Sequence, residues 1–184
     1  MTKHHYKTSE TLQKLVSLNL SLKEDYGNDL DNYLGISLID LNEEEEYRYD
    51  CTPLGSIVFA ATGMGGDHFA FFLSNHSTSR LDEAPIIFVQ PMDSEKPVKL
   101  VARNIIEFLS LFLKLKELYV LEGFDWYETE DDFNIDYKDN YLEQISDKQE
   151  EMEVITEKLQ QLFILKSIGN VYTYIKDLRR ELPI

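Results

Sequence analysis

The amino-acid sequence predicts a single α+β domain in which helices at the N- and C-terminal ends pack on a mostly antiparallel sheet. Its 184 residues, 43% of them hydrophobic, can bury one substantial core and are hard to divide into two. Short runs rich in β-branched and aromatic residues fill the middle of the chain, and stretches with helical apolar spacing lie on either side. The predicted domain spans residues 1–184, with a core region at 47–118 and an acidic, helical extension at 119–184.

The first expected element is an amphipathic helix that begins after Ser9, a capping candidate, and ends near Leu22. Its apolar positions are Leu12, Leu15, Val16 and Leu18. The pattern of residues 26–42 is ambiguous. The run of four glutamates at 43–46 is expected to form a solvated turn.

Extended segments follow in the core region, because β-branched and aromatic residues alternate with turn formers. They are expected at residues 47–52, 56–61, 68–74, 85–90 and 98–101. The second and third flank a glycine-rich turn and should pair as an antiparallel hairpin. The residues assigned to this structural turn are Gly63, Gly65, Gly66, Asp67 and His68.

A second helix is expected from Asn104, because a side-chain cap there lies three residues ahead of Glu107. The apolar residues that should face the sheet are Ile105, Phe108, Leu109, Phe112 and Leu115. Residues 119–140 combine acidic and aromatic side chains without a regular period. Two helices, at 141–165 and 171–182, are expected to close the chain after this segment.

The charge of the chain is concentrated in one segment. Against a formal net charge of -16, residues 122–157 contain fourteen acidic side chains and only Lys138 and Lys148 as bases. Such a surface repels phosphate backbones, so we expect no nucleic-acid partner. A basic protein partner is favoured, and the alternative interpretation is that the acid only keeps the protein soluble.

No stretch of the sequence is long and apolar enough to span a bilayer, and the polar N-terminus lacks the apolar core of a signal peptide. We therefore expect a cytoplasmic protein with no membrane partner. Cys51, the only cysteine, fits a reducing compartment and is expected to be a buried, inert thiol.

The acidic and aromatic segment is also the candidate partner-binding site. Its aromatic side chains could anchor a partner, or could instead fasten the segment to the core of the domain. The residues assigned to partner binding are Asp125, Trp126, Tyr127, Glu128, Glu130, Asp131, Asp132 and Phe133.

Catalytic patterns are weak in this sequence. Asp67, His68 and His76 could form a site with two histidines and one carboxylate, but a structural turn explains Asp67 and His68 more simply. The glycine-rich turn leads into an aromatic strand instead of a helix N-terminus, which argues against a phosphate cradle. We therefore expect no catalytic residue, no metal and no cofactor.

Four segments in order resemble the SUKH superfamily: residues 50–53 (DCTP), 62–71 (TGMGGDHFAF), 85–92 (PIIFVQPM) and 104–111 (NIIEFLSL). The resemblance implies an α+β domain with a curved, mostly antiparallel sheet packed by helices. It also implies a binding role, because many bacterial members are immunity proteins that neutralise toxins, often nucleases. No catalytic residue belongs to the family pattern.

Three functions are therefore considered. The first is an immunity protein whose acidic surface neutralises a nuclease-type toxin. The second is a cytoplasmic adaptor or regulatory module that binds another protein. The third is a small metal-dependent hydrolase that uses Asp67, His68 and His76.

Overall fold

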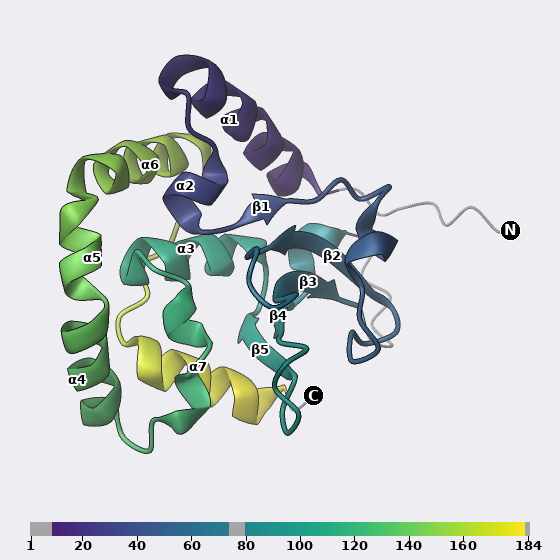
Figure 1. Cartoon of the computed structure of the whole chain (residues 1–184), viewed down its shortest axis with the longest axis vertical. Helices are drawn as coiled ribbons and strands as arrows, with labels where there is room; N and C mark the ends of the chain where they lie inside the picture. Colours follow the sequence, from purple (N-terminus) through teal and green to yellow (C-terminus); the bar gives the residue numbers. More distant parts are fainter. Residues whose placement is uncertain (1–8, 74–79, 183–184) are drawn as a thin grey trace, which may run out of the picture.

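The computed structural model describes residues 9–73 and 80–182, and within them it confirms the α+β fold class (Figure 1). Five antiparallel strands form one sheet in the order β1-β2-β3-β4-β5, so each strand pairs with its neighbour in sequence. The strands are β1 (Ser37–Leu38), β2 (Ser56–Ala61), β3 (His68–Phe72), β4 (Ile86–Val89) and β5 (Val98–Ala102).

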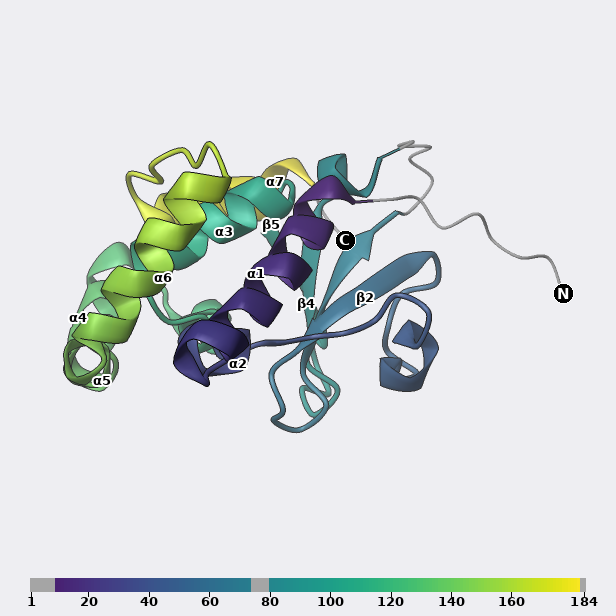
Figure 2. The same ribbon diagram turned by 90° about the horizontal axis from the view of Figure 1, so that it is seen from above.

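Helices precede and follow the sheet, and Figure 2 shows α1 and α3 on the same side of it. The α-helices are α1 (Glu10–Tyr26), α2 (Leu30–Leu34), α3 (Ile105–Leu115), α4 (Glu130–Asn140), α5 (Leu142–Asp147), α6 (Gln149–Leu162) and α7 (Val171–Glu181). Short 3₁₀ turns are η1 (Glu44–Tyr47), η2 (Leu81–Glu83), η3 (Tyr119–Leu121) and η4 (Phe124–Trp126). None of the helices in the described ranges is both long and apolar enough to cross a membrane.

The two helix starts expected from capping residues are present. The Ser9 hydroxyl accepts from the Leu12 N–H at 2.9 Å, and the Asn104 side chain accepts from the Glu107 N–H at 2.9 Å. Each cap satisfies an amide that would otherwise have no partner at a helix N-terminus. The Glu107 carboxylate accepts from the Tyr174 hydroxyl at 2.7 Å, which ties α7 to α3.

One face of the sheet carries aromatic side chains that pack against α3. The Phe108 ring of α3 lies 5.9 Å from the Phe59 ring and 4.9 Å from the Phe69 ring, centroid to centroid. All three side chains are buried. Because side chains alternate along a strand, the neighbours of Phe59 and Phe69 in the chain, such as Val58 and Ala70, point to the opposite face.

The opposite face carries smaller aliphatic side chains, including Val58, Ala70 and Ile87, which are fully buried. Leu178 of α7 packs in the same cluster, and Cys51 packs against it from the segment before β2. Both faces are therefore covered, and the core extends through the whole sheet. Cys51 is half-buried instead of buried, and desolvation still raises the pKa of its thiol.

Two expectations for residues 43–52 are wrong. The segment 47–52 is not a strand, because η1 ends at Tyr47 and the chain then turns before Pro53. Glu44 is buried at 4% exposure, whereas the whole glutamate run was expected to be solvated. Its carboxylate accepts from the Val58 N–H at 3.1 Å, next to the point where the β2–β3 register shifts. Strand β1 pairs with Ala60 and Ala61 of β2, and the Glu44 carboxylate supplies an acceptor to an amide of β2 beyond that pairing.

Regular structure also appears where the sequence pattern gave none. Residues 26–42 contain α2 and β1, and residues 119–140 contain η3, η4 and α4. The single helix expected at 141–165 is divided into α5 and α6. The predicted strand at 68–74 ends at Phe72, and residue 74 lies outside the described residues.

Candidate protein-binding surface

Helices α4, α5 and α6 follow one another as a curved band along one side of the molecule (Figure 1). We call this band, residues 130–162, the acidic arc. Its carboxylate side chains belong to Glu130, Asp131, Asp132, Asp136, Asp139, Glu143, Asp147, Glu150, Glu151, Glu153 and Glu157. All of these residues except the half-buried Asp136 are exposed. The negative charge therefore lies on one continuous helical surface.

This charge is largely uncompensated. Of the fourteen acidic side chains between residues 122 and 157, only Asp125 forms an ion pair within the described ranges, and its partner is Arg179 of α7. The other thirteen carboxylates have no ion-pair partner there, so solvent and salt are what screen their charge. The arc therefore presents a negative field to an approaching molecule.

Apolar side chains are exposed among these carboxylates. Helix α5 has no buried residue, and its Leu142 is 42% exposed. Ile135 of α4 is 60% exposed. Leu142, Ile145 and Met152 also line an open groove of about 470 Å³ between α5 and α6. Carboxylates beside exposed apolar groups are suited to a side chain with an aliphatic stem and a cationic head.

Both acidic residues and one lysine line the groove. Glu153 and Glu157 line it from α6. Lys116 lines it from the end of α3, and its ammonium donates to the Thr156 hydroxyl at 2.5 Å. Burial lowers the pKa of Lys116.

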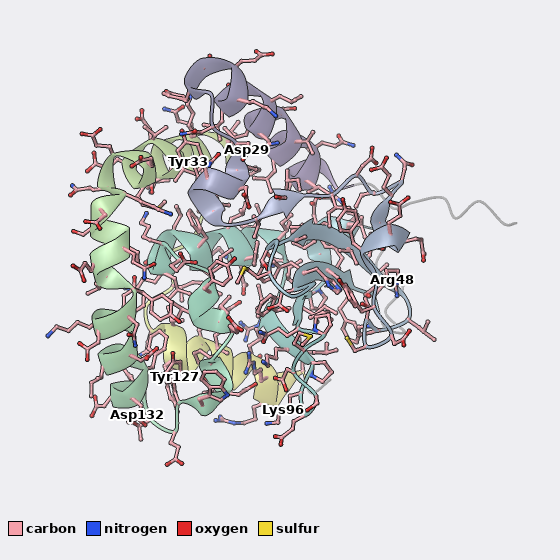
Figure 3. The ribbon with its side chains drawn as sticks, in the orientation of Figure 1. Asp29, Tyr33, Arg48, Lys96, Tyr127 and Asp132 are labelled. Atoms are coloured by element: carbon pink, nitrogen blue, oxygen red, sulfur yellow. The ribbon has the colours of Figure 1, made fainter. Side chains whose placement is uncertain are left out.

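Two of the predicted partner-binding aromatics are part of the core. Tyr127 is 8% exposed and Phe133 is 5% exposed, with their ring centroids 5.5 Å apart. Phe124 completes the cluster, 5.8 Å from Phe133. Figure 3 shows Tyr127 lying inside the fold between α4 and α7. These rings fasten α4 to the domain, so the prediction that they meet a partner is corrected, whereas Trp126 is 82% exposed.

The predicted acidic residues differ in whether their carboxylates already have a partner within the domain. Asp125 is neutralised by Arg179, and Glu130 accepts from the Asn170 amide at 2.6 Å. Asp132 completes a capping box at the start of α4, where its carboxylate accepts from the Thr129 N–H at 2.9 Å. All of these contacts lie toward α7 or the N-terminal end of α4.

The remaining predicted acids, Glu128 and Asp131, are exposed and form no ion pair within the described part of the chain. Asp132 is also exposed and lies at the outer end of α4 (Figure 3). The uncompensated surface thus begins at these residues and continues along α5 and α6, farther than the eight residues predicted. The sequence predicts one continuous helix through the groove residues Ile145 and Met152. The helix instead breaks after Asp147, and no glycine or proline in the sequence predicts that break.

The glycine-rich turn joins β2 to β3. Gly63, Gly65 and Gly66 all have positive φ, at 74°, 55° and 84°. A Cβ on Gly66 would lie 2.3 Å from the Tyr49 ring, so only glycine fits there without moving that side chain. Asp67 and His68, which end the turn, are 7% and 1% exposed.

Behind the turn, a chain of buried polar side chains crosses from β3 to β5. The Gln90 amide donates to the Asp67 carboxylate at 3.2 Å and accepts from the ammonium of Lys99. Lys99 also pairs with the Asp93 carboxylate at 2.8 Å. Burial raises the pKa of Asp67, whereas the Lys96 N–H and the Lys99 ammonium lower the pKa of Asp93 to about 2. Sequence reasoning missed this network, although a lysine within the otherwise apolar strand VKLVA was a signal for it.

The histidine of the possible metal site is already engaged. His68 Nε2 lies 3.1 Å from the Thr52 hydroxyl, and Nδ1 lies 2.8 Å from the Gly66 carbonyl. Both ring nitrogens therefore have protein partners, and burial lowers the pKa of the ring. His76 lies outside the described residues, and the described ranges contain no metal-ligand cluster.

Comparisons of the chain with protein-family models, with curated proteins and with solved structures gave no match. The class that fold and surface together define is an α+β domain with an acidic helical flank.

Proposed function

We propose that this chain is a non-enzymatic protein-binding domain that takes a basic protein partner on the acidic arc. The observation that carries the proposal is the thirteen carboxylates without an ion pair among the described residues, most of them on one helical surface. Long-range attraction by such a surface speeds encounter with a cationic partner. Exposed Trp126, Ile135 and Leu142 would then supply contacts that lose water on binding.

Within this class, we favour an immunity protein that neutralises a nuclease-type toxin in the bacterial cytoplasm. A nuclease must attract phosphate, so its substrate cleft is basic and complements the acidic arc. The resemblance of residues 50–111 to the SUKH superfamily supports the same role. The second candidate is a cytoplasmic adaptor that binds an endogenous basic protein by the same surface, since the arc itself favours cationic partners of either origin.

The test compares two triple charge reversals with the same change in net charge. Asp131→Lys, Glu143→Lys and Glu150→Lys alter the arc. The control, Glu24→Lys, Asp50→Lys and Glu95→Lys, alters exposed acids elsewhere. Immobilised wild type and both variants are exposed to lysate of the native host at low and high salt, and association rates of the retained proteins are measured.

We expect basic proteins to be retained by the wild type and the control at low salt, with association to the arc variant slowed by about tenfold or more. Equal association rates for the two triple variants would refute the arc as the docking surface. Inhibition of a retained nuclease, and survival of cells that produce it, would support neutralisation. A retained partner without toxic activity would support the adaptor.

A metal-dependent hydrolase finds less support in the geometry. It would require His68 to release the Thr52 hydroxyl or the Gly66 carbonyl before it could bind an ion. Stoichiometric zinc or manganese in protein purified from metal-rich buffer, lost on His68→Gln, would favour the hydrolase over the binding role.

A further inference from the structure

The outermost strand of the sheet leaves its backbone open on one side. In the β1–β2 pair, Ser37 lies opposite Ala61, and the Ile39 N–H donates to the Phe59 carbonyl at 2.9 Å. Because hydrogen bonding alternates along an antiparallel strand, the N–H and C=O of Leu38 point away from β2. In the part of the chain that the structure describes, neither group has a hydrogen-bond partner, and no strand lies beyond β1 (Figure 1).

A groove of about 670 Å³ runs beside this edge, between α1 and residues 38–42. Val16 and Leu20 of α1 line the groove and are 43% and 58% exposed. The half-buried Leu41 lines it from the other side. Apolar walls beside unpaired backbone groups fit an extended chain, which can bond through its backbone and cover the walls with alternate side chains.

One end of the groove is acidic. Asp40 and Asn42 line it, and the exposed Glu43 and Glu46 follow in the chain, whereas Glu45 pairs with Arg48. This charge favours an occupant with a basic residue at that end. A second copy of this chain would bring another net charge of -16 to the same place, so self-association is opposed by repulsion.

We propose that this edge is a second docking surface, separate from the acidic arc, which takes an extended peptide segment of a partner protein as an additional strand. The segment pairs with the N–H and C=O of Leu38 and places apolar side chains on Val16 and Leu20. A lysine or arginine of the segment meets the exposed Asp40, Glu43 and Glu46. Binding at this edge does not require the acidic arc, so the tests of the two surfaces have independent outcomes.

The test selects short random peptides, displayed on phage, against the immobilised full chain. Leu38→Pro removes the outward N–H without removing a β1–β2 hydrogen bond, since the Leu38 N–H does not face β2. Leu20→Lys places a charge in the groove. Leu54→Lys is the control, because Leu54 is an exposed leucine in the turn before β2 and belongs neither to the groove lining nor to the acidic arc.

We expect selected peptides to contain alternating apolar residues and a basic end. Both groove variants should weaken their binding by about tenfold or more, whereas Leu54→Lys should leave it unchanged. Bound peptide should also slow hydrogen exchange at the amide of Leu38. Selection of no peptide, or peptides that bind Leu20→Lys as tightly as the wild type, would overturn the proposal. If circular dichroism shows that Leu38→Pro is unfolded, Leu20→Lys decides alone.

Discussion

Replacing Lys99 with methionine is expected to lower the free energy of unfolding by about 2 to 3 kcal/mol, because it breaks the buried network behind the glycine-rich turn. Lys99 is 6% exposed, and its ammonium contacts the Gln90 side chain, the Asp93 carboxylate and the Glu122 carbonyl. Methionine keeps most of the apolar stem, so the substitution tests the ammonium and not the packing.

The magnitude follows from what each partner loses. Gln90 is 4% exposed, and leaving its buried acceptor without a donor costs about 1 to 3 kcal/mol. The Asp93 side chain is 32% exposed, so water replaces much of the ion pair and its loss adds at most about 1 kcal/mol. The contact with the Glu122 carbonyl is long, at 3.3 Å, and belongs to an exposed residue, so it adds little.

The assay is urea unfolding followed by far-ultraviolet circular dichroism. The control is Lys96→Met, the same substitution at an exposed lysine in the loop before β5 (Figure 3). Lys96→Met should change the free energy of unfolding by less than about 0.5 kcal/mol. If the two variants are equally stable, the Lys99 ammonium contributes nothing and the reasoning about the network is refuted.

Two further predictions concern the core and the buried histidine. Phe108→Ala should lower the free energy of unfolding in urea by about 3 to 5 kcal/mol, because the ring is 1% exposed and packs between Phe59 and Phe69. Trp126→Ala, at an 82% exposed ring, is the control. A loss below about 1 kcal/mol for Phe108→Ala would contradict the packing. Since burial lowers the pKa of His68, the neutral ring stabilises the fold above the unfolded value of about 6.5, and this stability is lost as pH falls from there through the folded pKa. His68→Gln should remove this loss of stability, which is at most about 1.4 kcal/mol per pH unit between pH 7 and 5. Parallel curves of stability against pH for wild type and variant would refute the role of His68.

Local chemistry made the sheet and the capped helices predictable. Four of the five expected extended segments correspond to β2, β3, β4 and β5, because runs of β-branched and aromatic residues bounded by turn formers are local features of the sequence. The caps at Ser9 and Asn104 are equally local. The short strand β1 could not be predicted, because its two residues are extended only through pairing with β2.

Tertiary contacts determine which aromatic residues of the candidate surface are exposed. An aromatic ring in an acidic segment has the same local pattern whether it faces solvent or the core, and the sequence left both interpretations open for Trp126, Tyr127 and Phe133. Contacts with Phe124 and with Tyr172 of α7, which lies about forty residues farther along the chain, bury Tyr127 and Phe133. Trp126 points away from that cluster and stays exposed.

The position of α7 explains why its bases contact residues outside α5 and α6. Arg179 of α7 neutralises Asp125, and the Lys176 ammonium lies 5.2 Å from the centre of the Tyr172 ring and 3.2 Å from the Tyr127 carbonyl. Lys176 and Arg179 are thus held against residues 124–127, whereas residues 142–162 contain only Lys148 and Lys158 as bases. Under the proposed function, a cationic partner would therefore be drawn toward α5 and α6 and away from α7, so the same contacts that anchor the C-terminal helix would also orient the approach.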